Sequence, residues 1–222
     1  MKDYQRAFIQ FAIENHALLF GSFTLKSGRT SPYFFNSGLF NTGETLAKLG
    51  EFYAQAIIHA NIEYDMLFGP AYKGIPLVST VAIALARVHN RNVPYCFDRK
   101  EVKDHGEGGL WVGAPLHGRI LIVDDVISAG VTAYNMINKI QSIANTEVSG
   151  IAITLDRQER NQDGHTQLST TASLRKNYHI PIANIIALND IIEYLSEQPG
   201  EDNKKSLALM HDYQEKYGGS FS

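Results

Sequence analysis

The run Ile120-Leu121-Ile122-Val123 constrains the fold more than any other segment of this chain. Four consecutive apolar residues predict a strand that is buried on both of its faces. Such strands are typical of parallel sheets, because the crossover connections between parallel strands place helices on both faces. The segment therefore predicts a sheet with this strand inside it and helices on either side.

Strand-like and helix-like segments alternate along most of the chain around that run. Short apolar runs predict further strands at residues 66–68, 93–97, 148–155 and 182–188. Apolar residues at helical spacing predict helices between them, through Val78, Ala82 and Leu85, and through Ala133, Met136, Ile137 and Ile140. The alternation predicts the α/β class, with a mostly parallel, twisted sheet flanked by helices. With 222 residues the chain is expected to form one domain.

The first 40 residues stand outside this alternation. Tyr4, Phe8, Phe11 and Ala12 repeat at helical spacing, and two extended runs around Ser27-Gly28 predict a β-hairpin. We expect this helix and hairpin to form a small cap. Thr42 is expected to cap the next helix, and the polar segment 197–205 to link to a last helix.

Composition and charge narrow the class of partners. The formal net charge of −3 argues against a general nucleic-acid-binding protein, which usually carries a strong basic excess. Cys96 is the only cysteine, so no disulfide can form within the chain and a reducing compartment is expected. No apolar stretch is long enough to span a bilayer, and residues 1–6 have no signal-peptide character. We expect a cytoplasmic protein with no membrane or nucleic-acid partner.

Two acids and a small-residue loop follow the strand at residues 120–123. Asp124 and Asp125 stand at its carboxyl end, and the loop after them opens a helix. Ligands of open parallel sheets bind at this edge, and the free amides of a helix N-terminus suit a phosphate. Ser128 and Thr132 can add hydroxyl donors, whereas the carboxylates suit ribose hydroxyls or a metal ion. A polar turn with a helix cap is the structural alternative, and the combination of both acids with this loop favours a binding site.

The stretch from residue 99 to residue 118 is rich in glycines and charges, which predicts a long mobile loop. Arg99, Lys100, Lys103 and His105 lie close together in its first part. A mobile cationic loop can close over a polyanion and stabilise a departing pyrophosphate. Taken alone, however, a charge run of this kind is more often a solvated loop.

Three further segments have chemistry that depends on their context. Lys26 with Phe34 and Phe35 offers a cation and aromatic faces for a planar anionic base, but the same residues also fit a hairpin with core aromatics. Segment 68–74 follows a strand and opens a helix, so it is either a phosphate-binding loop or a simple Gly-Pro turn. Arg157 follows another predicted strand and matches a carboxylate, although an isolated arginine there is more often a surface ion-pair residue.

These strings together resemble a known family. Residues 120–132 resemble the PRPP-binding motif of the type I phosphoribosyltransferases, in which a hydrophobic strand precedes paired acids and a small-residue loop. The strings R-K-x-x-K-D-H-G-E-G-G at residues 99–109 and K-S-G-R-x-S-P-Y-F-F-N at residues 26–36 resemble the catalytic loop and N-terminal hood of orotate phosphoribosyltransferases. The resemblance implies the type I phosphoribosyltransferase fold. It also implies an enzyme that transfers the ribose 5-phosphate of PRPP to orotate, forming orotidine 5′-monophosphate and pyrophosphate in de novo pyrimidine (UMP) biosynthesis.

The resemblance assigns roles to individual residues. Catalytic contacts are implied for Lys103, His105, Asp124 and Asp125. Orotate contacts are implied for Phe34, Phe35, Ser128 and Arg157. PRPP contacts are implied for Lys26, Tyr72, Lys73, Arg99, Lys100, Lys103, His105, Asp124, Asp125, Val126, Ile127, Ser128, Ala129, Gly130, Val131 and Thr132. Val131 stands where relatives often have threonine, which removes one hydroxyl donor to the 5′-phosphate.

The resemblance further implies a cofactor, an assembly and one backbone feature. Mg²⁺ is expected to be held mainly through PRPP and water, with no direct side-chain ligand. A homodimer is expected in which residues 99–118 of one subunit reach the active site of the other, while residues 1–40 form a hood over the site. A non-proline cis peptide bond is expected between Ala71 and Tyr72.

Two other functions remain open on the residues alone. One is a phosphoribosyltransferase whose substrate is a purine or uracil, but such a base has no carboxylate for Arg157 to bind. A non-catalytic regulator on the same fold, binding nucleotide or RNA, would not need Lys100, Lys103 and His105. The presence of these residues favours the orotate enzyme.

Overall fold

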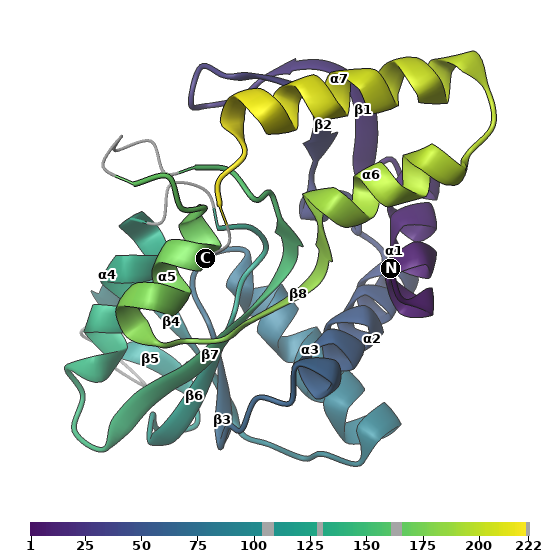
Figure 1. The fold of residues 1–222 in the computed structure, drawn as a ribbon. Coiled ribbons are helices and arrows are strands. Elements are labelled where there is room, and N and C mark those ends of the chain that lie inside the picture. The colour runs from purple at the N-terminus through teal and green to yellow at the C-terminus, as the bar shows by residue number, and fades with distance from the viewer. Residues whose placement is uncertain (104–108, 128–130, 161–165, 221–222) are drawn as a thin grey trace.

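A computed structural model describes residues 1–103, 109–127, 131–160 and 166–220 of the chain. A sheet of strand order β5-β4-β3-β6-β7-β8 runs through its centre (Figure 1). Its strands are β3 (Met66–Gly69), β4 (Tyr95–Lys103), β5 (Gly109–Gly113), β6 (Gly118–Val123), β7 (Thr146–Asp156) and β8 (Ile182–Ala187). The strands from β4 across to β8 run parallel, and β5 pairs antiparallel at one edge. The mostly parallel α/β fold predicted from the sequence is confirmed.

Strand β6 lies inside the sheet, between β3 and β7. Ile120, Leu121, Ile122 and Val123 are all buried. Ile120 and Ile122 belong to the hydrophobic core on one face of the sheet, and Leu121 and Val123 belong to the core on the other face. This alternation is the burial on both faces that the continuous apolar run predicts.

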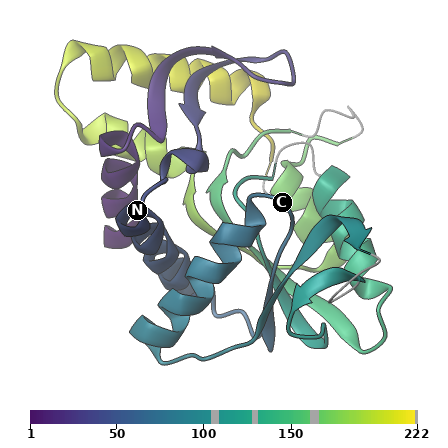
Figure 2. The same cartoon turned by 180° about the vertical axis from the view of Figure 1, so that it is seen from behind.

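Helices cover both faces of the sheet (Figures 1 and 2). Helices α2 (Gly43–Ala60) and α3 (Gly74–His89) pack into the core that contains Leu121 and Val123. Helices α4 (Val131–Gln141) and α5 (Thr170–Tyr178) pack into the core that contains Ile120 and Ile122. Thr42 caps α2 as predicted, because its hydroxyl accepts the N–H of Thr45 at 3.2 Å. In the described part of the chain, none of the helices combines the length and apolar character that crossing a membrane requires.

The predicted N-terminal cap is present in the first 40 residues. It consists of α1 (Asp3–Glu14), the antiparallel pair β1 (Leu18–Thr24) and β2 (Thr30–Phe35), and the short 3-10 helix η1 (Ser37–Leu39). Phe8 of α1 anchors it to the main core by packing edge-on against Phe52 of α2, with ring centroids 5.2 Å apart. The helix and hairpin are therefore attached to the same core as the sheet.

Two C-terminal helices complete this cap, and the sequence did not predict that arrangement. Helix α6 (Leu188–Glu197) is followed closely by α7 (Glu201–Tyr217), which lies along the hairpin in Figure 1. The linker predicted over residues 197–205 was wrong in extent, because Glu201 and Asp202 already form the first turn of α7. Acidic side chains stabilise a helix at that end, so a polar composition there does not indicate a loop.

The stretch from residue 99 to residue 118 contains strand structure that the sequence analysis read as loop. Strand β4 continues to Lys103, and β5 pairs with it so that Asp98 lies opposite Trp111. The Trp111 ring packs edge-on against Phe68 of β3, with centroids 5.5 Å apart. Edge strands pair through their backbone and commonly carry charged side chains. The charged and glycine-rich sequence therefore did not indicate this edge hairpin.

Candidate active site

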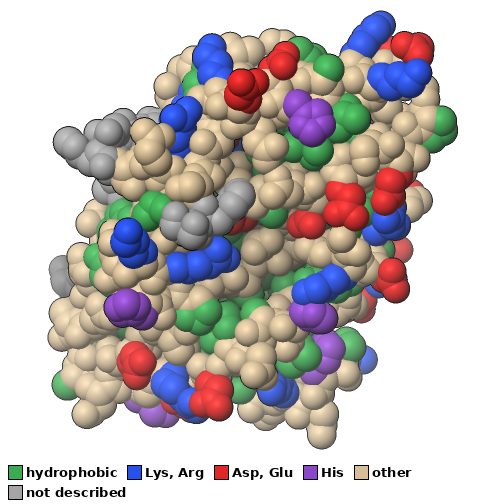
Figure 3. All heavy atoms as spheres, viewed as in Figure 1, with side chains coloured by type: hydrophobic (Ala, Val, Ile, Leu, Met, Phe, Trp, Pro, Cys, Tyr) green, Lys and Arg blue, Asp and Glu red, His purple; other side chains and the backbone are tan. Residues whose placement is uncertain are grey.

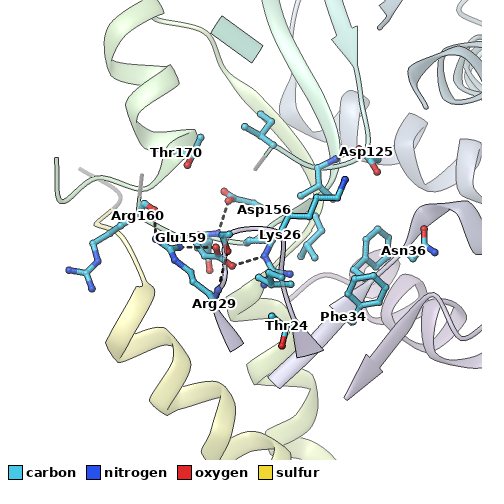
Figure 4. A pocket seen from close by; sticks show the side chains of 18 of the residues that line it. Thr24, Lys26, Arg29, Phe34, Asn36, Asp125, Asp156, Glu159, Arg160 and Thr170 are labelled. Carbon is cyan, nitrogen blue, oxygen red and sulfur yellow. Dashed lines mark hydrogen bonds and ion pairs between the residues drawn. The ribbon is translucent and has the colours of Figure 1, made fainter. Parts of the chain in front are cut away.

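A pocket of about 490 Å³ lies between the β1–β2 hairpin and the carboxyl ends of β6 and β7 (Figure 4). Its walls include residues that are far apart in the sequence. Of the residues predicted as site residues, the pocket is lined by Lys26, Phe34, Phe35, Lys73, Asp125, Val126, Ile127 and Arg157. One cavity therefore joins residues expected to contact the base with residues expected to contact the sugar phosphate. On the face shown in Figure 3, basic and acidic side chains are interspersed around the molecule.

The paired acids follow β6 directly. Asp125 lines the pocket, where its carboxylate accepts hydrogen bonds from Lys73 Nζ at 2.5 Å and from the hydroxyl of Ser37 at 3.2 Å. The carboxylate of Asp124 accepts the backbone N–H of Asp125 at 2.8 Å, and the main-chain oxygen of Asp124 accepts the Tyr53 hydroxyl at 2.7 Å. These contacts fix both acids at the edge of the sheet.

The environment of Asp124 favours its protonated form. Burial is the main cause, and the charge of Asp125 adds to it, so that the pKa of Asp124 rises to about 7. The nearby Lys73 opposes this rise in part. Near neutral pH Asp124 is therefore close to the midpoint between its protonated and ionised forms, and a bound cation or a developing positive charge would favour its ionisation.

The raised pKa of Asp124 predicts a pH-dependent stability. A carboxyl group whose pKa is raised by folding stabilises the folded state at low pH, and this stabilisation is lost as the pH rises from the unfolded pKa through about 7. Asp124→Asn does not titrate, so its free energy of unfolding relative to the natural chain should rise by about 2 to 3 kcal/mol between about pH 5 and pH 8. Urea denaturation at both pH values measures this difference.

Asp65→Asn is the matched control for that measurement. Its hydrogen bonds with Arg119 lower the pKa of Asp65 to about 2, so Asp65 stays ionised at both pH values and its variant should show a constant difference. A constant difference for Asp124→Asn as well would mean that Asp124 is already ionised at the lower pH.

Arg157 is held in the pocket wall by a network of buried contacts. Its Nε donates to Glu159 at 2.6 Å, and its Nη2 donates to the Ser31 hydroxyl at 3.1 Å and to the Tyr213 hydroxyl at 3.2 Å. The guanidinium carbon lies 4.3 Å from the centroid of the Tyr33 ring. The side chain is only 13% exposed, so its orientation is set by contacts from the hairpin and from α7. A guanidinium fixed in this way is suited to binding a carboxylate.

Sequence reasoning missed the partners of Arg157. Glu159 also accepts Arg29 Nη1 at 3.0 Å and the Tyr213 hydroxyl at 2.7 Å, so it holds two arginines and a tyrosine together. Arg29 and Glu159 stand inside the two strings that carry the hood and Arg157, and their opposite charges were an available signal. Tyr213 gave no such signal, because it lies far away in the last helix.

The aromatic residues of β2 divide between the core and the pocket. Tyr33 is fully buried, whereas Phe34 is 38% exposed and its ring stacks on Phe23 with centroids 5.5 Å apart. Successive side chains of a strand point to opposite faces, so Phe34 can present its ring to the pocket while Tyr33 supports Arg157. The hairpin therefore contains a core aromatic and aromatic side chains that line the pocket, and the orotate contacts of Phe34 and Phe35 stay predictions.

The loop between β3 and α3 carries the predicted pyrophosphate contacts. The Ala71–Tyr72 peptide bond is cis, as expected. Lys73 lines the pocket, whereas Tyr72 is 66% exposed and its ring lies 4.5 Å from Lys100 Nζ of β4. Among the described residues, Tyr72, Arg99, Lys100 and Asp124 are not part of the pocket lining itself. Tyr72 directly precedes Lys73, and Arg99 and Lys100 lie on β4, which pairs with β3.

Several predicted site residues lie wholly or partly outside the described part of the chain. Ser128, Ala129, Gly130 and His105 lie outside the described residues, and the backbone alone is described at Lys103, Val131 and Thr132. Lys103 ends β4, and Val131 and Thr132 begin α4. Their assigned contacts therefore remain predictions.

The fold and the site together define a class of protein. Residues 37–168 match the family model described as the phosphoribosyl transferase domain, and this segment includes the acids after β6, Lys73 and Arg157. The chain is thus a phosphoribosyltransferase by fold and by the composition of its pocket.

Closer relatives narrow the class further. The chain is 54% identical to an orotate phosphoribosyltransferase of Yersinia enterocolitica over 218 residues, which cover 98% of this chain and 100% of the relative. It is equally similar to the orotate phosphoribosyltransferase of Stutzerimonas stutzeri, at 54% identity with the same coverage. The crystal structure of orotate phosphoribosyltransferase from Francisella tularensis superposes with a TM-score of 0.85 at 43% identity, covering 96% of this chain and 100% of that one. The chain belongs to the orotate phosphoribosyltransferase family.

Proposed function

We propose that this chain transfers the ribose 5-phosphate of PRPP to orotate in the pocket between the hairpin and the sheet, forming orotidine 5′-monophosphate and pyrophosphate in de novo pyrimidine biosynthesis. The observation that carries the proposal is the joint lining of one cavity by Phe34, Lys73, Asp125 and Arg157. A planar anionic base and a sugar phosphate need these groups in one place. Family membership gives the same reaction.

Orotate is a flat ring with a carboxylate, and one end of the pocket offers a partner for each part. Arg157 can pair with the carboxylate, because Glu159 and Tyr213 already hold the guanidinium in position. Phe34 supplies an apolar face for the ring. The position of these two groups would orient the attacking ring nitrogen toward the acids after β6.

PRPP would occupy the other end of the pocket. We assign its ribose hydroxyls to Asp124 and Asp125, its 5′-phosphate to the segment from Val126 to Thr132, and its pyrophosphate to Tyr72 and Lys73. The bond from C1 of the ribose to pyrophosphate breaks as positive charge develops on the ring, so catalysis depends on positioning and on electrostatics. Lys73 moves from Asp125 to the pyrophosphate in this scheme, which frees the carboxylate to face the developing charge.

Mg²⁺ is proposed to bind with PRPP. Within residues 1–103, 109–127, 131–160 and 166–220, no cluster of three or more His, Cys, Asp or Glu side chains could hold a metal ion. Mg²⁺ dehydrates reluctantly and commonly binds through substrate phosphates and water rather than in an all-protein site, so it is expected to be held mainly through PRPP and water, with no direct side-chain ligand. The ion would neutralise charge on the leaving pyrophosphate.

The cationic stretch from residue 99 to residue 118 is proposed to act across a homodimer. Arg99, Lys100, Lys103 and His105 of one subunit would then cover the pyrophosphate bound to the other. Mixing a Lys103→Ala chain with an Asp125→Ala chain, each inactive alone, should restore up to about a quarter of the natural activity through hybrid dimers. Refolding the two chains together allows them to exchange, and no recovery after refolding would place Lys103 in its own subunit's site.

The cellular location is proposed as the cytoplasm. The single cysteine, Cys96, is a free thiol, which fits a reducing compartment. Burial raises the pKa of Cys96 to about 11, so the thiol stays protonated and unreactive at neutral pH.

A turnover assay tests the proposed function. Orotate absorbance should fall only when PRPP and Mg²⁺ are both present, with one pyrophosphate released for each orotate consumed. Uracil and adenine should react at least about a hundredfold more slowly, because a base that has no carboxylate cannot form the ion pair with the buried guanidinium of Arg157. Strong turnover with only such a base would overturn the proposal.

A further inference from the structure

Asp98 is a buried acid that the proposed reaction does not use. It lies in β4 and is only 6% exposed. Its Oδ1 accepts the backbone N–H of Ala71 at 2.7 Å, and its Oδ2 accepts Lys139 Nζ of α4 at 3.0 Å. One carboxylate thus connects the loop after β3, the edge hairpin and helix α4.

Lys139 is itself held in place by the edge hairpin. Its ammonium lies 4.7 Å from the centroid of the Trp111 ring, and Trp111 lies opposite Asp98 in the β4–β5 pairing. Trp111 in turn packs against Phe68 of β3, two residues before Pro70, where the loop between β3 and α3 begins. The cation that neutralises Asp98 is therefore positioned by an aromatic ring as well as by the carboxylate.

An ion pair with one buried partner is weak evidence for a purely stabilising role. Burial of the Asp98 carboxylate costs free energy that its attraction to the half-buried Lys139 only partly returns, and well-packed apolar side chains often give equal stability. What apolar side chains could not do is accept the N–H of Ala71. Ala71 directly precedes Tyr72 and Lys73, and Tyr72 is contacted from the same strand by Lys100.

We propose that Asp98, neutralised by Lys139, is a positioning residue that holds the Ala71–Lys73 segment in the conformation that receives the pyrophosphate of PRPP. The inference rests on the proposed function for the identity of that ligand. Asp98 acts through the backbone of Ala71 and does not contact substrate. Its removal should therefore affect pyrophosphate-bearing ligands and spare orotate.

The test compares variants of Asp98 by steady-state kinetics and by binding of pyrophosphate alone. Asp98→Ala should raise both KM for PRPP and the inhibition constant of pyrophosphate by about tenfold, the effect of one lost hydrogen bond to a buried donor, with KM for orotate changed less than about twofold. Asp98→Asn keeps an acceptor oxygen for Ala71 and should recover most of the natural values. Should Asp98→Ala fail to fold, the double variant Asp98→Val/Lys139→Met replaces the pair by apolar groups and should show the same tenfold selectivity.

Asp65→Ala is the matched control, because the carboxylate of Asp65 also accepts one backbone N–H and one cationic side chain, both from Arg119, at 2.8 Å and 2.9 Å. It should leave all the constants unchanged. The inference is overturned if Asp98→Ala or the double variant leaves the pyrophosphate constants unchanged, if KM for orotate rises equally, or if Asp98→Asn is as impaired as Asp98→Ala. A natural chain that binds pyrophosphate but does not consume orotate would instead overturn the proposed function.

Discussion

Replacing Arg157 by methionine is expected to lower kcat/KM for orotate by about a thousandfold, or about 4 kcal/mol. The guanidinium is buried and held by Glu159, Ser31 and Tyr213, so it is oriented for its ligand before orotate arrives. Methionine keeps much of the apolar length of the side chain. Glu159 keeps Arg29 as a charged partner, so the variant should remain folded.

The decisive measurement for Arg157 is base selectivity. Because uracil lacks the carboxylate, Arg157→Met should lower the ratio of kcat/KM for orotate to kcat/KM for uracil by about a thousandfold. KM for PRPP should change less than about threefold. Arg175→Met is a suitable control, because Arg175 is a half-buried arginine of α5 that donates to the main-chain oxygen of Ile182 away from the pocket lining. Unchanged selectivity in Arg157→Met would show that another group binds the carboxylate.

The central sheet was predictable because its signal is local. Burial on both faces requires a continuous apolar run, which Ile120–Val123 displays without reference to any other segment. The meeting of Asp125 and Arg157 was predictable for a related reason. Both follow strands of one parallel sheet, and the carboxyl ends of such strands lie at one edge whatever the helices do.

The rest of the site depends on contacts that leave no local signal. Tyr213 supports Arg157 from a helix in which only Met210 and Tyr213 are buried, so its helical periodicity is weak. Asp98 stands in a charged stretch that is typical of a loop, and only the fold reveals Ala71 and Lys139 as its partners. Family resemblance supplied the roles of Ser128 and His105, which the described residues do not include.

Asp125→Asn is expected to lower kcat by about a hundredfold to a thousandfold with little change in KM for PRPP. The Asp125 carboxylate lines the pocket and accepts Lys73 Nζ at 2.5 Å. In the proposed reaction this ion pair separates when pyrophosphate takes Lys73. The carboxylate then faces positive charge that develops on the ribose only in the transition state, so its loss should appear in kcat.

Binding of PRPP should suffer much less in Asp125→Asn, because the substitution also removes the carboxylate that competes with pyrophosphate for Lys73. Ser37→Ala is the matched control, since it deletes a 3.2 Å hydrogen bond to Asp125 and leaves the charge in place; it should lower kcat less than about fivefold. A loss confined to KM would mean that Asp125 binds the ribose equally in the ground state and the transition state. A kcat within about threefold of the natural value would exclude electrostatic stabilisation by Asp125 and leave that role to Asp124, whose raised pKa makes its ionisation depend on the ligand itself.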